Sequence, residues 1–170
     1  EYMFRASPHT RIAGNVYTST DYPAEQPIFL HNEHSYSPRF PLRLMFYCQT
    51  APATLGATPI GGGRFITAEI PQAIKEKFQR LGVLYVRNYG DGFGLPWSTV
   101  FQTEDRGEVE RYCASMGIEW EWKANNGLRT LQRGPALVRH PRSGEILWFN
   151  HATFFHVSTL PPAIGAPLMQ

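Results

Sequence analysis

The clearest helical pattern in the chain lies in PQAIKEKFQRL, residues 71–81. Ile74, Phe78 and Leu81 recur there at helical spacing, a proline occupies the first turn, and Gly82 follows the last apolar residue. The pattern predicts one amphipathic helix over this range. A second, shorter helix is predicted over 104–116, where acidic residues come first and a glycine follows the end.

The rest of the chain alternates between short stretches rich in β-branched and aromatic residues and stretches rich in Gly and Pro. The Gly- and Pro-rich stretches at 51–63 and 90–97 predict loops, and HPRSGE predicts a hairpin turn. Many short strands with two helices, and no strict βαβ alternation, indicate an antiparallel β framework with peripheral helices, such as a jelly roll. The predicted strands are 11–18, 27–33, 42–49, 83–89, 118–123, 128–133, 136–140 and 145–150.

Composition adds limits on size and partners. The chain has 170 residues, of which 42% are hydrophobic and 14% aromatic, enough for one folded domain over 1–170. A net charge of +2 without a basic run speaks against nucleic-acid binding. No apolar run is long enough to cross a membrane and no signal peptide is visible, so a cytoplasmic protein is expected. Cys48 and Cys113 lie in apolar stretches and are expected to be buried free thiols.

The first candidate for chemistry is His31-Asn32-Glu33, within FLHNEH. In an extended strand, residues two apart point to the same face, so the imidazole and the carboxylate would converge. Together they would supply two ligands of a 2-His-1-carboxylate facial triad, the arrangement that holds Fe(II) in oxygenases. So short a motif also arises by chance in a chain with six His, and by itself it favours an ordinary solvated or core histidine over a metal ligand.

Two further stretches carry candidate polar groups. Thr58 lies in GATPI, where its hydroxyl can donate to a carboxylate or simply belong to a turn. In HPRSGEILWFNHATFFH, a hairpin would bring Asn150, His151 and His156 close together. The two histidines can be ligands or structural residues.

Taken in order, these stretches resemble one family. GNVYTSTDYPAEQPIFLHNEHSYSPRFPLRLMFYC, GATPI, GVLYVRNYGDGFGLPWSTVFQT and HPRSGEILWFNHATFFHVSTL are similar to the taurine dioxygenase-like superfamily, in its clavaminate synthase-like and syringomycin-biosynthesis hydroxylase-like branch. The resemblance covers nearly the whole chain. It implies a double-stranded β-helix (jelly roll) that binds Fe(II) and 2-oxoglutarate.

The resemblance also implies roles for particular residues. His31 and Glu33 match the proximal metal ligands, and Thr58 matches a threonine that holds the far carboxylate of 2-oxoglutarate. Asn150 and the region of His156 match a segment that borders the substrate cavity.

Two departures from the family pattern stand out. The family usually has G-G-E-T-P-I where this chain has LGATPI, so an acidic residue is lost while the threonine is kept. The C-terminal signature that brings the distal His ligand and the Arg that clamps 2-oxoglutarate has no counterpart in this sequence. We therefore expect the chain to be cut at both ends and to hold only part of the jelly roll.

The resemblance implies oxidation of an unactivated C–H bond, most simply hydroxylation, of a small amino-acid-like substrate, free or bound to a carrier protein, in a biosynthetic pathway. A carboxylate ligand at Glu33 favours hydroxylation over halogenation. Two other hypotheses remain. The chain can be a truncated or non-catalytic binding protein of the same fold, or a cupin-like metal hydrolase that uses His31, Glu33 and either His151 or His156 without 2-oxoglutarate.

Overall fold

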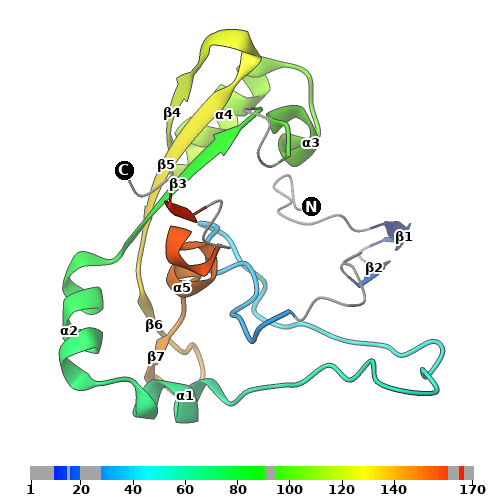
Figure 1. Ribbon diagram of the computed structural model, residues 1–170, viewed down its shortest axis with the longest axis vertical. Helices are drawn as coiled ribbons and strands as arrows, with labels where there is room; N and C mark the ends of the chain where they lie inside the picture. The colour runs from blue at the N-terminus through cyan, green and yellow to red at the C-terminus, as the bar shows by residue number, and fades with distance from the viewer. Residues whose placement is uncertain (1–9, 15, 20–27, 91–94, 161–164, 167–170) are drawn as a thin grey trace. The chain divides into compact units, whose positions relative to one another are not determined.

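The computed structural model describes residues 10–14, 16–19, 28–90, 95–160 and 165–166 (Figure 1). The chain divides into two compact units, one formed by residues 1–28 with 84–133 and the other by 29–83 with 134–170. Within the described residues, no helix is both long and apolar enough to cross a membrane. The first unit begins with a small antiparallel hairpin of β1 (Arg11–Ala13) and β2 (Val16–Tyr17).

The main element of the first unit is a three-stranded sheet in the order β3 (Val83–Tyr89), β5 (Leu128–Gly134), β4 (Glu119–Trp122). Strands β4 and β5 are antiparallel and are joined through the 3₁₀ turn η1 (Ala124–Asn126). Helices α3 (Trp97–Phe101) and α4 (Arg106–Met116) complete the unit (Figure 1).

The core of the first unit lies between α4 and this sheet. Val109 and Cys113 of α4 are fully buried, as is Leu128 of β5. Helix α4 begins where the Asp105 side chain accepts a hydrogen bond from a first-turn amide, and it ends at Gly117 in the left-handed conformation. The sequence signals for this helix therefore act as expected.

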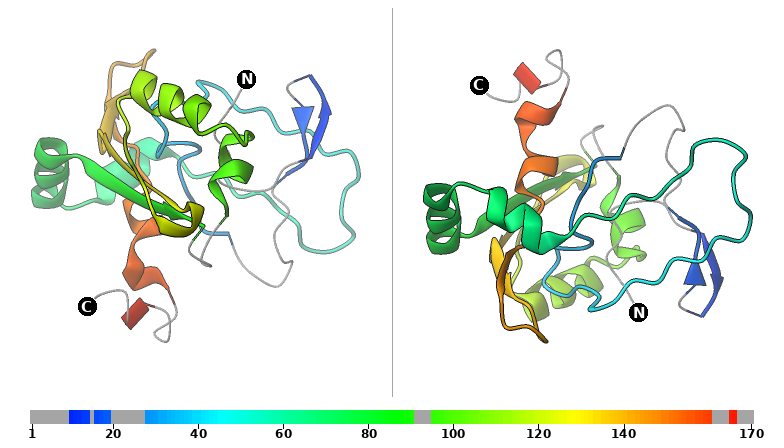
Figure 2. Two further views of the ribbon diagram at one scale, coloured as in Figure 1. Left: turned by 90° about the horizontal axis from the view of Figure 1, so that it is seen from above. Right: turned by 90° about the horizontal axis from the view of Figure 1, so that it is seen from below.

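The second unit contains a helix pair, a hairpin and a short C-terminal helical stretch (Figures 1 and 2). The hairpin pairs β6 and β7 in antiparallel fashion, and its turn is closed by a bond from the His140 amide to the Glu145 carbonyl. The elements are α1 (Gly63–Glu69), α2 (Gln72–Leu81), β6 (Leu137–Arg139), β7 (Ile146–Trp148), α5 (Ala152–Phe155) and η2 (Val157–Thr159).

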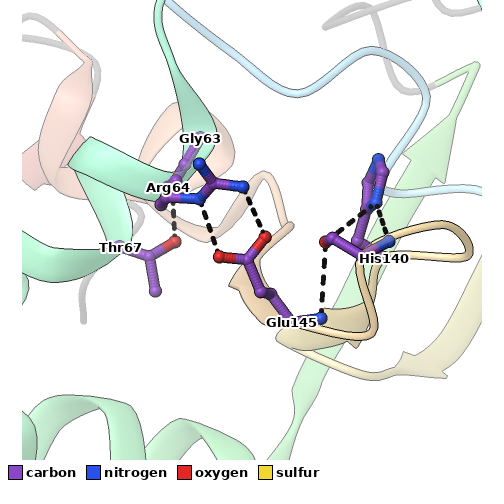
Figure 3. Close-up of polar contacts among 6 residues, drawn as sticks. Gly63, Arg64, Thr67, His140 and Glu145 are labelled. Carbon is purple, nitrogen blue, oxygen red and sulfur yellow. Dashed lines mark hydrogen bonds and ion pairs between the residues drawn. The ribbon is translucent and has the colours of Figure 1, made fainter.

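Helix α1 is fixed to the hairpin by two side chains, of which Figure 3 shows the link from Arg64 to Glu145. Arg64 forms a two-pronged ion pair with Glu145, with both N···O distances at 2.7 Å. The buried Thr67 hydroxyl donates to the Gly63 carbonyl at 2.7 Å and accepts from the amide of Trp148 at 2.9 Å. The end of β7 is thereby held from the side of α1.

Most of the elements predicted between residues 71 and 150 are confirmed, with ends that differ by one or two residues, and residues 51–62 are irregular as expected. Three predicted strands are wrong. Among the described residues, neither 28–33 nor 42–49 is in a strand, because no other strand of the described chain pairs with them. The single strand predicted over 11–18 is instead the antiparallel hairpin of β1 and β2. The expected burial of Cys48 is also wrong. Its side chain is exposed in this unpaired stretch, whereas Cys113 is buried. The predicted loop 90–97 lies partly outside the described residues.

Candidate metal site

The side chains of His31 and Glu33 converge, although not by the predicted route. His31 lies in irregular backbone and Glu33 opens a turn, so the expectation that both lie on one strand is wrong. The turn is held by bonds from the Ser35 amide to the Asn32 carbonyl and from the Ser37 amide to the His34 carbonyl. It nevertheless brings the Nε2 atom of His31 to 3.5 Å from Oε2 of Glu33.

The orientation of the His31 ring is set by the backbone. Its Nδ1 lies 2.8 Å from the carbonyl oxygen of Phe29, an acceptor only, so Nδ1 carries the proton and donates it. The Nε2 atom is left to face Glu33. Metal-binding histidines are typically oriented in this way, with one ring nitrogen bonded to a carbonyl and the other directed at the metal.

The two groups shift each other's acidity. The hydrogen bond to Glu33 is the main cause that raises the pKa of His31, and burial partly opposes it. The same hydrogen bond is the main cause that lowers the pKa of Glu33, with help from the charges of His34 and His151. A proton shared between a carboxylate and an imidazole nitrogen occupies the place where a cation would bind both.

A second imidazole, not singled out from the sequence, lies on the other side of Glu33. The Nε2 atom of His34 is 3.3 Å from Oε1 of Glu33, so the two imidazoles approach different oxygens of one carboxylate. His34 has a positive φ of 53°, and it occupies the turn that reverses the chain after Glu33. The sequence HNEH contained the clue to this second imidazole. Where the chain reverses at a turn, the histidines on both sides of Glu33 can reach its carboxylate.

Two side-chain contacts hold this turn against the end of β7 and the segment that follows it. The Ser35 hydroxyl lies 2.6 Å from Nδ1 of His151, and both side chains are buried. A longer contact, at 3.5 Å, runs from the Asn32 amide to the carbonyl of Trp148. The His151 ring also lies edge-on to Tyr36, with centroids 4.9 Å apart, and 5.5 Å from the ring of His31.

The other predicted site residues lie in different settings. Asn150 is buried, donates to the Ala136 carbonyl and accepts from the Ala152 amide, so it shapes the backbone beside the turn. His156 is exposed and caps η2 by accepting from the Ser158 amide. Thr58 is exposed in irregular backbone.

Among the hydrogen bonds and ion pairs of the described residues, none joins Thr58 to the turn at His31 and Glu33. The role of Thr58 in cosubstrate binding, and of Asn150 and His156 in substrate binding, therefore stay predictions.

The donor set suits a divalent iron ion. One imidazole nitrogen and one carboxylate oxygen point at the same place, and the side chains of His31 and Glu33 remain 30% and 37% exposed, so an ion and a small ligand can reach them. Among the described residues, no three His, Cys, Asp or Glu side chains are arranged to hold a metal.

Comparison with known proteins agrees with this chemistry. The family model described as "Taurine catabolism dioxygenase TauD, TfdA family" matches residues 2–165. The chain belongs to this family. Its membership confirms the predicted fold class, an antiparallel β framework with peripheral helices that forms part of a jelly roll.

Two curated relatives are similar along most of the chain. The dapdiamide synthesis protein DdaC of Enterobacter agglomerans is 37% identical over 168 residues, which is 99% of this chain and 51% of that protein. The clavaminate synthase-like protein At3g21360 of Arabidopsis thaliana is 30% identical over 159 residues, which is 88% of this chain and 48% of that protein. The chain thus spans about half the length of the curated relatives it matches.

Proposed function

We propose that this chain is the metal-ligating part of an Fe(II)- and 2-oxoglutarate-dependent dioxygenase. The observation that carries the proposal is that Nε2 of His31 and Oε2 of Glu33 converge to 3.5 Å. The His31 ring is held in this orientation by its bond to the Phe29 carbonyl. Family membership supports it, since members of the TauD/TfdA family generally use this metal and this cosubstrate. A cytoplasmic location stays a prediction from the sequence.

In the proposed enzyme, His31 and Glu33 would be two of the protein ligands that hold the metal. Bound there, Fe(II) and 2-oxoglutarate would supply the activation of O₂ needed to oxidise an unactivated C–H bond. The protein's own task is to keep the neutral, Nδ1-protonated form of His31 and the ionised form of Glu33 directed at the ion. The Phe29 carbonyl accepts a hydrogen bond from Nδ1 of His31 and thereby leaves Nε2 to face the acid. The hydrogen bond from His31, and then the neighbouring imidazoles of His34 and His151, favour the ionised form of Glu33.

The substrate we propose is a small amino-acid-like molecule, free or bound to a carrier protein, and the reaction a hydroxylation. One relative is named for dapdiamide synthesis and the other for its likeness to clavaminate synthase, which supports a biosynthetic role. A carboxylate at Glu33 leaves no ligand position for a halide in its place, which favours hydroxylation.

The third metal ligand and the cosubstrate clamp would come from the rest of the full-length protein. A version of the chain ending at Gln170 is then expected to bind Fe(II) weakly and to release no succinate, because two ligands do not make a facial triad. Turnover by the 170-residue chain alone at an ordinary enzyme rate would contradict this division of labour.

The experiment that tests the function is a succinate-release assay on the full-length protein with Fe(II) and 2-oxoglutarate. We expect release that depends on both, and loss of release in Glu33→Gln, which keeps the size of the side chain and removes the charge. Glu69→Gln is the matched control, because Glu69 is an exposed residue of α1. Metal binding without any succinate release would instead favour the non-catalytic binding protein, and hydrolysis without 2-oxoglutarate would favour the cupin-like hydrolase.

A further inference from the structure

The least expected polar contact near the candidate site is buried and joins residues far apart in the sequence. Ser35 lies two residues after Glu33, and His151 lies at the end of the segment after β7. Their side chains are 8% and 3% exposed, and Oγ of Ser35 is 2.6 Å from Nδ1 of His151. A buried hydrogen bond this short fixes both side chains, because leaving either polar atom without a partner in such a place is unfavourable.

The position of this contact relates it to the metal-binding turn. The turn at residues 31–36 is irregular, and no strand among the described residues pairs with it. The segment after β7, in contrast, is well anchored: Asn150 is bonded to Ala136 and Ala152, and the Trp148 amide is bonded to Thr67. The Ser35 contact therefore ties an irregular turn to a segment that is anchored by its own hydrogen bonds.

The rings around His151 point to the same conclusion. His151 lies 5.5 Å from the His31 ring and edge-on to Tyr36 at 4.9 Å, and Phe154 lies close to both histidines at 5.5 and 5.6 Å. The His151 imidazole thus packs near the His31 ring on one side and is hydrogen-bonded to Ser35 of the turn on the other. Its Nδ1 is engaged by the Ser35 contact, so the position of the ring and the position of the turn depend on each other.

We propose that Ser35 and His151 are positioning residues that act as one unit and hold the turn so that His31 and Glu33 face a common point. The inference rests on the proposed metal site. It gives Ser35 and His151 a role that follows neither from the family resemblance nor from the convergence of His31 and Glu33. Residues that orient metal ligands without touching the metal typically contribute roughly 10- to 100-fold to affinity.

The test is a double-mutant cycle on the full-length protein, with Co(II) as the probe in place of Fe(II). Ser35→Ala removes the hydroxyl, and His151→Phe keeps a ring between Tyr36 and His31 while removing the nitrogen. We expect each change to weaken Co(II) binding about tenfold, at the lower end of that range, and to alter the visible absorption spectrum of the bound ion, which reports ligand geometry. The double variant should be no weaker than either single variant, because both changes remove the same contact. Ser35→Thr, which keeps a hydroxyl, should restore the affinity and the spectrum.

The chain offers a matched control in the exposed pair of His140 and Ser143, whose Nδ1 and Oγ atoms are 3.1 Å apart in the hairpin turn. His140→Phe and Ser143→Ala should leave Co(II) affinity and spectrum unchanged. If His151→Phe fails to fold, Ser35→Ala with its Ser35→Thr partner still decides the matter, since each alters the smaller side chain only.

The outcomes separate the two levels of the proposal. If the unaltered protein binds no Co(II), the proposed function fails, and this inference fails with it. If the unaltered protein binds Co(II) and Ser35→Ala and His151→Phe bind it equally well, the positioning role is overturned while the function stands. Additive losses in the double variant would also overturn it, because they would mean that the two residues act separately.

Discussion

The hydroxyl of Thr67 offers the sharpest test of how the second unit is held together. It donates to the Gly63 carbonyl and accepts from the amide of Trp148, so one buried atom joins α1 to β7. Thr67→Val removes this hydroxyl with almost no change in shape or helix propensity. The Trp148 amide then loses its partner, which should lower the free energy of unfolding by about 1–3 kcal/mol.

Thr67→Ser is the matched variant, because it keeps the hydroxyl and loses only a methyl group, worth about 0.8 kcal/mol. Urea unfolding followed by circular dichroism measures both, and the slope with urea should be the same in each if both variants unfold from the same structure. The reasoning predicts that the valine variant is the less stable of the two. A valine variant as stable as the serine variant would refute the bridging role of the hydroxyl.

Three further changes test other parts of the structure. Gly82→Ala should lower the free energy of unfolding by about 1–3 kcal/mol, because Gly82 has a φ of 68° and an added Cβ would lie 2.6 Å from a backbone carbonyl of β5. Gly117 has a similar φ of 66° but lies in open space, so Gly117→Ala should cost less in the same urea titration. With a thiol-specific reagent at pH 8, the exposed Cys48 should react quickly. Cys113 should react only on unfolding, because burial raises the pKa of its thiol to about 11. Rapid labelling of both thiols in the folded protein would contradict this. The ion pair with an arginine of α1 lowers the pKa of Glu145, so its contribution to stability should be present above the ordinary glutamate pKa of about 4.3 and be lost as the pH falls through the lower, folded value; a stability difference from Glu145→Gln that does not shrink on acidification would argue against it.

Elements with local signals could be predicted from the sequence. Helix α2 has its apolar spacing, its leading proline and its closing Gly82, and it was found within one residue. The hairpin of β6 and β7 was found because its turn sequence is local as well. Helix α1 was missed, because its glycine-rich start indicates a loop and its support comes from Arg64 and Thr67 contacting residues about 80 positions away.

The strands predicted at 27–33 and 42–49 show the opposite error. Their β-branched and aromatic residues have strand propensity, but a strand also needs a partner, and propensity says nothing about whether one is present. For the same reason the convergence of the His31 and Glu33 side chains was predicted correctly, while the strand predicted to carry them was wrong, and their role as metal ligands stays a prediction. The spacing of His31 and Glu33 allows convergence on a strand, and the turn achieves it by reversing the chain instead.

The central claim is that His31 and Glu33 bind one metal ion, and anomalous X-ray scattering from crystals of the full-length protein grown with Fe(II) tests it most directly. The account predicts a single strong peak at the iron edge, within bonding distance of Nε2 of His31 and of one carboxylate oxygen of Glu33, and no peak there in crystals of Glu33→Gln. A peak bound by other residues, or a metal-loaded protein in which His31 and Glu33 remain bonded only to each other, would contradict it.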